Sequence, residues 1–369
     1  MSNIMGSELD QTALSVFDVF TPTAALSAAA IARPAVSSAI AAALAVPGRQ
    51  LLLYGQTGSG KSTALFQQLM GHMVVVRCTP ETTLASVLSV AVQRYGIETY
   101  GDPIGTLPAV AAALGKRGLR VVIEDAHRLE KAERARMFSA MKLFSDLGNR
   151  FPALMIIAIA AVDSTEVLGH VDIEFSSRIA EVRVPGMTAR ELSDIVTLGG
   201  DMLNVSTDQI AGEIAQISGG MPSVAHALAL DAFMDAGITH GSDEHRVVGV
   251  DSLDRAIDNR LTATPSHVTA RFDAVLARQR DCDATRTVLT ALAEFEPDGV
   301  RVATLIDHLR RNELVRADEY VPDIVASLVQ DGSVVVPTTD GRVRFAYGLL
   351  HSHWSLLTRQ LPAGATPRN

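Results

Sequence analysis

One stretch of the sequence combines glycines, a lysine and a hydroxyl in the phosphate-binding pattern G-x-x-x-x-G-K-[ST], and it runs from Gly55 to Ser62. Glycines in such a loop let backbone N–H groups point at phosphate oxygens, and the start of the following helix adds a favourable dipole. Lys61 would reach the β- and γ-phosphates, and the Ser62 hydroxyl would help to hold Mg²⁺. The pattern predicts a site for ATP and Mg²⁺, and its expected binding residues are Gly55, Thr57, Gly58, Ser59, Gly60, Lys61, Ser62 and Thr63.

The residues around this loop favour a genuine site over a glycine-rich turn that arose by chance. Residues 50–54 suit a short buried strand, and residues 63–70 suit the start of a helix. A strand that leads into the loop and a helix that leaves it are the context in which this pattern binds phosphate.

A second strand end carries the carboxylates that a P-loop nucleotidase needs to hold its metal and position water. The apolar residues 121–123 run into Glu124 and Asp125. By position, Glu124 should address Mg²⁺ through water, and Asp125 should orient the attacking water. The usual order is Asp before Glu, and the shorter Asp125 reaches about one methylene less far, so slow or partner-dependent hydrolysis is expected. The alternative is a pair of exposed acids at a strand end.

Four further polar residues lie near the ends of expected strands. Arg178 precedes the last strand, where a cation can project toward a neighbouring subunit's γ-phosphate as an arginine finger does; otherwise it is an ordinary surface arginine. Asp163 and Ser164 follow the fourth strand, and they either sense the γ-phosphate or cap the next helix. His127 either couples the acid pair to the helix below it or is a surface histidine.

Apolar strands and amphipathic helices alternate across residues 35–186, which implies an α/β domain with a parallel sheet and helices on both faces. Residues 187–262 suit helices only, with Thr188 as the cap of the first. In residues 263–369, helices precede a hairpin around Asp340-Gly341, which is the order of a winged helix. Residues 1–34 are expected to form a poorly ordered arm. The expected strands are 50–54, 73–77, 119–124, 153–159 and 180–184.

The order of these motifs resembles the AAA+ ATPases, and within them the branch that includes origin-recognition-like and STAND-type signalling ATPases. The resemblance covers about residues 20–360 and is carried by residues 55–63, 121–129, 177–191, 219–228 and 340–350. It implies an ATP-hydrolysing P-loop domain, a helical lid and a winged helix, with copies that assemble as a ring or spiral. It also places Arg33 near the adenine.

One residue departs from the pattern of that family. The family's lid motif Gly-Gly-x-Pro is often followed by an arginine that contacts the γ-phosphate, but Ser223 follows Pro222 in this chain. Together with the order of Glu124 and Asp125, this departure favours a switch that ATP binding sets over a fast motor.

The winged-helix segment carries little positive charge for DNA. The helix that would enter a DNA groove, residues 318–331, has four acids and no Lys or Arg, and across residues 280–360 nine cations face twelve acids, a net −3. Phosphates would repel this surface despite Arg342 and Arg344 in the wing, so contact with protein is favoured over DNA. A second route to DNA is a channel lined by Arg128, Lys131, Arg134, Arg136 and Lys142, although the interleaved acids make a solvated helix face the commoner interpretation.

The composition fits a cytoplasmic protein without a membrane segment. The two cysteines, Cys78 and Cys282, lack the spacing of a disulfide framework or zinc site, and the longest apolar run, 153–162, is about half a membrane span. The net charge of −9 gives no general support for a nucleic-acid partner. We expect an ATP-dependent homo-oligomer that controls a partner effector protein in a bacterial defence or regulatory system. The alternatives are an ATPase that loads or polymerises on duplex DNA, and an ATP-binding scaffold without turnover.

Overall fold

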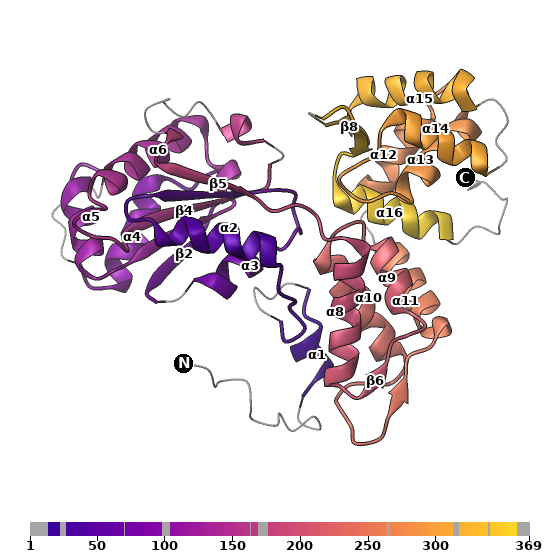
Figure 1. Ribbon diagram of the computed structural model, residues 1–369, viewed down its shortest axis with the longest axis horizontal. Coiled ribbons are helices and arrows are strands. Elements are labelled where there is room, and N and C mark those ends of the chain that lie inside the picture. The colour runs from indigo at the N-terminus through magenta and orange to yellow at the C-terminus, as the bar shows by residue number, and fades with distance from the viewer. Residues whose placement is uncertain are drawn as a thin grey trace. The chain divides into compact units, whose positions relative to one another are not determined.

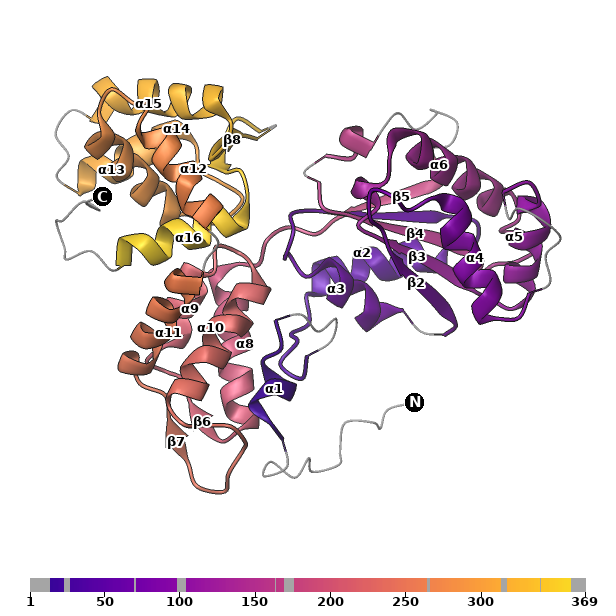
Figure 2. The same ribbon diagram turned by 180° about the vertical axis from the view of Figure 1, so that it is seen from behind.

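The computed structural model describes residues 14–22, 27–69, 71–97, 104–162, 164–168, 176–263, 266–312, 317–338 and 340–359. The chain folds into two compact units. The sheet unit is Ala32–Pro185, and the helical unit combines Met1–Ile31 with Gly186–Asn369. The chain therefore crosses between the units twice, at residues 31–32 and 185–186 (Figures 1 and 2).

A five-stranded parallel sheet forms the centre of the sheet unit. Its strands are β1 (Gln50–Tyr54), β2 (Met73–Arg77), β3 (Arg120–Glu124), β4 (Met155–Ala160) and β5 (Ile179–Arg183), in the order β2-β3-β4-β1-β5. Every pairing is parallel, so the carboxyl ends of all five strands lie at one edge of the sheet. The predicted strands are confirmed to within two residues at each end.

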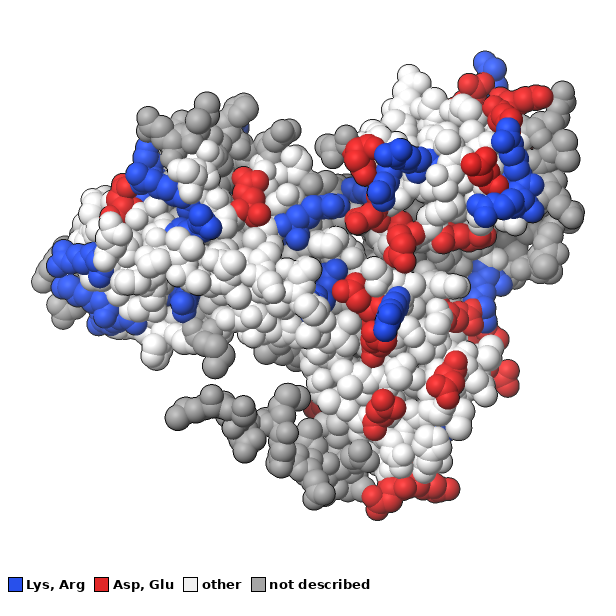
Figure 3. All heavy atoms as spheres, viewed as in Figure 1, with Lys and Arg blue, Asp and Glu red and all other residues white. Residues whose placement is uncertain are grey.

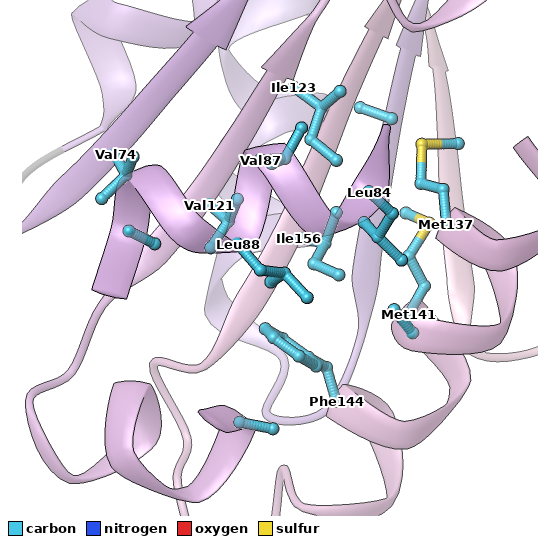
Figure 4. Close-up of a cluster of buried hydrophobic side chains, with 14 of the residues drawn as sticks. Val74, Leu84, Val87, Leu88, Val121, Ile123, Met137, Met141, Phe144 and Ile156 are labelled. Atoms are coloured by element: carbon cyan, nitrogen blue, oxygen red, sulfur yellow. The ribbon is translucent and has the colours of Figure 1, made fainter. Parts of the chain in front are cut away.

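Helices cover both faces of this sheet, which explains why its strands are apolar on both sides. On one face, α2 (Pro34–Ala45) and α3 (Lys61–Gln68) pack with Leu51 and Leu53. On the other, α4 (Leu84–Arg94), α5 (Leu107–Lys116) and α6 (Lys131–Asp146) pack with Leu52, because successive side chains of a strand point to opposite faces. Figure 4 shows this second cluster, in which α4 and α6 meet Val121 and Ile156 of the strands.

The helical unit contains a group of four helices that we call the lid. They are α8 (Ala189–Met202), α9 (Ala211–Ile217), α10 (Pro222–Asp235) and α11 (Val250–Ala263), with the short paired strands β6 (Val205–Ser206) and β7 (Arg246–Val247) beside them. The predicted cap of α8 is confirmed. The Glu191 N–H donates to the Thr188 hydroxyl at 3.2 Å, and the Thr188 N–H donates to the Glu191 carboxylate at 2.8 Å.

The described residues of the expected N-terminal arm pack on the lid. α1 (Val16–Val19) is followed by Phe20, whose side chain is fully buried and whose ring centre lies 5.1 Å from that of Phe233 in α10. Ala29 and Ile31 contact the same hydrophobic cluster. The described residues of this segment therefore pack with the helical unit.

The rest of the helical unit is a winged helix made of α12 (Ser266–Leu276), α13 (Cys282–Ala293), α14 (Val302–Arg311), α15 (Ala317–Asp331), β8 (Val335–Pro337), β9 (Val343–Phe345) and α16 (Gly348–Arg359). β8 and β9 form the predicted antiparallel wing. α16 joins the winged helix to the lid, because Arg359 pairs with Asp254 of α11 at 2.8 Å and also with Glu213 of α9. None of the described helices combines the length and the apolar character that a membrane crossing requires.

A buried histidine should make the stability of the helical unit sensitive to acid. The rings of His226 in α10 and Phe20 lie 6.0 Å apart, and burial lowers the pKa of His226 from 6.5 to about 4. Below pH 6.5 the unfolded chain binds a proton that the folded chain refuses, so stability falls as the pH drops from 6.5 toward 4. Because of this group, the free energy of unfolding in urea should be about 2 kcal/mol lower at pH 5 than at pH 7.5.

The single tryptophan, Trp354, reports on this unit by fluorescence. The matched variant is His226→Gln, which keeps a polar side chain but does not titrate. Between pH 7.5 and pH 5, its free energy of unfolding should fall by about 2 kcal/mol less than that of the wild type. Equal steepness in the two proteins would contradict the assignment.

Candidate nucleotide site

The P-loop leaves the carboxyl end of β1 and leads into α3, as its pattern predicts. Gly55, Gly58 and Gly60 have φ angles of +149°, +77° and +84°, which favour glycine. Gly55 is the most constrained, because a Cβ atom there would lie 2.2 Å from the carbonyl oxygen of Val184. The loop is thus packed directly against the residue that follows β5, and a side chain at its first position would force it away.

Lys61 and Ser62 begin α3 with their functional groups turned back toward the loop and the acid strand. The Lys61 ammonium donates to the carbonyl oxygens of Gly55 at 3.0 Å and Gln56 at 2.6 Å. The Ser62 hydroxyl donates to Glu124 Oε1 at 2.6 Å. No side chain caps the first turn of α3, so its N–H groups suit an anion.

The two acids differ in their surroundings. Glu124 is only 8% exposed, and its second oxygen, Oε2, accepts a hydrogen bond from Arg77 at 3.3 Å. Asp125 has a φ of +55°, which is uncommon outside glycine, and it precedes the short 3₁₀ helix η2 (Ala126–Arg128). The Ser62 hydroxyl and the Glu124 carboxylate are oxygen ligands of the kind that Mg²⁺ prefers, and they lie together, so the residues fit this cation.

Arg77 is a site residue that the sequence analysis missed. It ends β2 directly opposite Glu124 in β3. The sequence does hold a signal, a basic residue at the end of a predicted strand, but strand neighbours are not apparent from a single sequence. The salt bridge offsets part of the negative charge that Glu124 brings to the site.

His127 links the acid strand to the end of β4. Its Nδ1 accepts the backbone N–H of Ala161 at 3.1 Å, which assigns the ring proton of the neutral form to Nε2. Burial lowers the pKa of His127; the nearby Asp125 opposes this shift and the charge of Lys61 adds to it. The His127 carbonyl also accepts a bond from Arg134 of α6 at 3.2 Å, whereas a coupling role of the His127 side chain stays a prediction.

Residues 47–163, which hold the loop and both acids, match the family model described as an AAA domain. This part of the chain is an AAA ATPase domain. The walker-type ATPase PABY2304 of Pyrococcus abyssi is similar in fold, with a TM-score of 0.53 at 14% identity over 88% of this chain and 96% of that chain. The ORC2 protein of Aeropyrum pernix gives 0.50 at 14% identity over 89% and 94%. These likenesses confirm the predicted α/β fold with its C-terminal helices and small antiparallel sheet, and no curated protein matches the sequence.

Arg178 precedes β5, so it lies at the edge of the sheet opposite the P-loop of the AAA domain. Its carbonyl accepts the N–H of Gln50 at the start of β1 at 2.8 Å. The loop leaves the other end of this five-residue strand, roughly 16 Å away. The Arg178 side chain is 44% exposed and pairs with Asp146 at the end of α6. Arg178 is therefore too far from its own chain's site to act there, so its role toward a neighbouring copy stays a prediction beside that of an ordinary surface arginine.

Arg33 contacts the backbone of the P-loop. The residue is 6% exposed, and its Nη1 donates to the carbonyl oxygens of Ser59 at 3.3 Å and Pro185 at 3.0 Å. These bonds bring Arg33 to the loop of the AAA domain, while its contact with the adenine stays a prediction.

The remaining expected site residues lie around the same loop. Thr57 is in the loop and Thr63 is in the first turn of α3. The Ser59 hydroxyl is buried without a hydrogen-bond partner among the described residues, and a phosphate oxygen would satisfy it. Ser164 follows β4 and its sensing role stays a prediction, whereas Asp163 lies outside the described residues.

Several of the cations considered for DNA contact are engaged within the chain. In the wing, Arg344 is 5% exposed and donates to a backbone carbonyl at 2.8 Å, and Arg342 pairs with Asp340 at 2.9 Å. On α6, Arg134 donates to three backbone carbonyls, and Arg136 pairs with an acid of the same helix. These contacts weaken both routes by which the chain would hold a duplex.

Replacing the first glycine of the loop should abolish tight nucleotide binding. In Gly55→Ala the new methyl group would clash with the Val184 carbonyl, so the loop must move and its N–H groups would no longer point at the phosphates. The affinity for a fluorescent ATP analogue should fall by at least about tenfold, measured by titration.

Gly212→Ala is the matched control, because a Cβ atom there meets nothing within 4 Å. Residue 212 lies in α9, where alanine favours the helix by up to about 1 kcal/mol. This variant should bind nucleotide like the wild type. Wild-type affinity in Gly55→Ala would contradict the packing of the loop against Val184.

Proposed function

We propose that the protein is a molecular switch. It binds ATP with Mg²⁺ at the P-loop, hydrolyses ATP slowly between copies of itself, and controls a partner protein through the resulting change. The hydrogen bond between Ser62 and Glu124 is the observation that carries this proposal. It brings the metal-binding hydroxyl of the loop and the acid strand to one point, next to Lys61, which is the arrangement that a triphosphate site requires.

Each residue would have a distinct role at the phosphates. Ser62 and Glu124 would hold Mg²⁺, which neutralises phosphate charge when it is bound. Lys61 would exchange its bonds to loop carbonyls for bonds to phosphate oxygens. Asp125 would orient the attacking water, but its left-handed backbone turns it out of line with β3, and its side chain is short. We therefore expect slow hydrolysis, so that the bound nucleotide carries the signal.

The charge distribution supports association between copies. The sheet unit holds 16 Lys or Arg against 13 Asp or Glu, whereas the helical unit holds 16 against 28. Figure 3 shows Lys and Arg gathered at the end of the sheet unit where α4 and α5 lie, and mostly Asp and Glu on the lid. Adjacent strands β3, β4, β1 and β5 each have an arginine at or shortly before their first residue: Arg120, Arg150, Arg49 and Arg178.

This basic edge and the acidic helical unit suit head-to-tail association, in which one face of a copy meets a different face of the next. Arg178 belongs to the basic edge. Association through that edge would let Arg178 act on a neighbouring copy, since it is too far from the P-loop of its own chain.

The winged helix is the part that we assign to contact with a partner protein. α15 is acidic, and its Asp318 and Asp331 pair with Arg310 and Arg278 within the same unit. A helix that reads a DNA groove needs cations on this surface, because each phosphate is negative. Since α16 is bonded to the lid, a shift of the lid would carry this surface with it.

The role of Arg178 between copies can be tested by mixing two inactive variants. Lys61→Ala should not hydrolyse ATP, because its own P-loop lacks the lysine. Arg178→Ala should hydrolyse ATP at least about a hundredfold more slowly than the wild type, because it supplies no arginine to the neighbouring copy's site. In an equal mixture, about a quarter of the contacts combine an intact Lys61 with a neighbour's intact Arg178. Phosphate release should therefore recover to about that fraction of the wild-type rate.

Asp146→Asn is the matched control, because it removes the ion pair of Arg178 but keeps the arginine. Its rate should resemble the wild type. A mixture that stays inactive, although both variants associate, would exclude the role in trans. Equal rates in the wild type, Lys61→Ala and Asp125→Ala would instead indicate an ATP-binding scaffold without turnover.

The alternative, an ATPase that loads on duplex DNA, predicts a different binding result. We expect a labelled duplex to bind weakly in fluorescence anisotropy, with no gain when ATP is added. The engaged cations of the wing and of α6 are the physical reason. Strong ATP-dependent binding with a steep loss of affinity as salt rises would contradict the switch as proposed and favour the DNA-loading ATPase.

A further inference from the structure

Arg33 lies beside both places where the chain passes between its two units. It is the second residue of the sheet unit, which begins at Ala32, and it bonds to Pro185, the last residue of that unit, at 3.0 Å. One buried side chain therefore ties the two crossing segments together on the side of the sheet unit.

The same side chain also bonds to the P-loop. Arg33 Nη1 donates to the carbonyl oxygen of Ser59 at 3.3 Å, between two glycines of the loop. The loop has a second contact with a crossing segment, because Gly55 packs directly against the Val184 carbonyl. Arg33 itself is fixed, since it precedes α2 and its carbonyl accepts the Ser37 N–H at 2.8 Å. The phosphate-binding loop and both crossing segments thus form one hydrogen-bonded group.

On the other side, both crossing segments are anchored in the lid. Ile31 packs against the hydrophobic cluster of the lid, and Met187 belongs to that cluster. The Met187 N–H also donates to the Gly220 carbonyl at 2.9 Å. A single residue on each segment, Ala32 or Gly186, separates the anchors of the two units. One residue spans at most about 3.6 Å, so each segment leaves little length between the anchors of the two units.

We propose that Arg33 is a positioning residue that couples phosphate binding in the P-loop to the position of the helical unit. Binding of phosphate would draw the N–H groups of the loop inward and take Lys61 from the carbonyls of Gly55 and Gln56. The Gln56 carbonyl also accepts the Ser59 N–H at 3.3 Å, so its release would reorient the peptide groups at Ser59. The charge-assisted bond makes Arg33 follow the Ser59 carbonyl and shift Pro185 with it. This route rests on the proposed switch, and it requires no arginine in the lid, where the chain has Ser223.

Energy transfer between two dyes, one on each unit, tests the coupling in the full-length protein. Cys282 is exposed in the helical unit, whereas Cys78 is buried, and burial raises its pKa to about 11. A maleimide dye therefore reacts with Cys282 and spares Cys78. Ser139→Cys on the exposed face of α6 supplies the second position. Transfer efficiency is compared in saturating ADP and in saturating non-hydrolysable ATP analogue.

The wild-type background should give different efficiencies with the two nucleotides. Arg33→Met keeps the length of the side chain but removes its donors, and it should reduce that difference to under about a third. Because Arg33 also contacts the P-loop, the affinity of each variant for the ATP analogue is measured separately, and transfer is compared only at saturating nucleotide. Arg33→Lys, which keeps a charged donor, should restore part of the difference. Arg94→Met, on the exposed end of α4, is the control that should change neither quantity.

A second variant lengthens a crossing segment without touching the loop. Insertion of two glycines between Ile31 and Ala32 should reduce the difference in transfer while nucleotide affinity is kept. A full difference in both Arg33→Met and the insertion variant would overturn the coupling, as would loss of nucleotide binding in Arg33→Met, which would make Arg33 a support of the site alone. If the wild type shows no difference between nucleotides, the switch itself fails, and this outcome is distinct from a failure of Arg33 to couple.

Discussion

The parallel order of five strands is the constraint on which the nucleotide site depends. The carboxyl ends of the strands meet at one edge, so the P-loop after β1, Arg77 of β2 and Glu124 of β3 lie close together. Glu124 accepts hydrogen bonds from both Ser62 and Arg77 there. The same order sends Arg178, which precedes β5, to the opposite edge. The topology therefore separates the part of the site that binds the triphosphate from the residue that would complete it. A site that hydrolyses ATP with Arg178 would need two copies.

The sequence predicted those parts of the structure whose signals lie within a few neighbouring residues. The loop glycines, the cap at Thr188 and the turn of the wing each belong to one short segment, and the alternating apolar strands report their own burial. What it could not reveal depends on residues that are distant in the chain. Phe20 packs on Phe233 across more than 200 residues, and Arg33 finds its acceptors in the backbone of Ser59 and Pro185. Backbone acceptors have no sequence signature, so no pattern search would have identified them.

In the lid, the Gly-Gly-x-Pro segment allows close packing against the winged helix. A Cβ atom on Gly220 would lie 2.3 Å from Pro297, and one on Gly219 would lie 3.0 Å from the side chain of His351 in α16. Both glycines of the Gly-Gly-x-Pro segment are thus needed to seat the winged helix on the lid. With Ser223 in place of an arginine, this segment offers close packing without a charged group for the γ-phosphate. The lid and the winged helix are consequently packed together, and in the proposed switch the nucleotide would act on them through the crossing segments.

These features together explain why binding and hydrolysis would be separated in time. Lys61, Ser62 and Glu124 are positioned within a single chain, so the residues that would hold ATP with Mg²⁺ belong to one copy. Hydrolysis would need an oriented water and a second cation. We assign the first role to the short Asp125 and the second to Arg178, which lies at the far edge of the sheet. A bound ATP would therefore persist until another copy arrives. The lifetime of the signal would then be set by self-association, which the opposite charges of the two units favour and which high salt should slow.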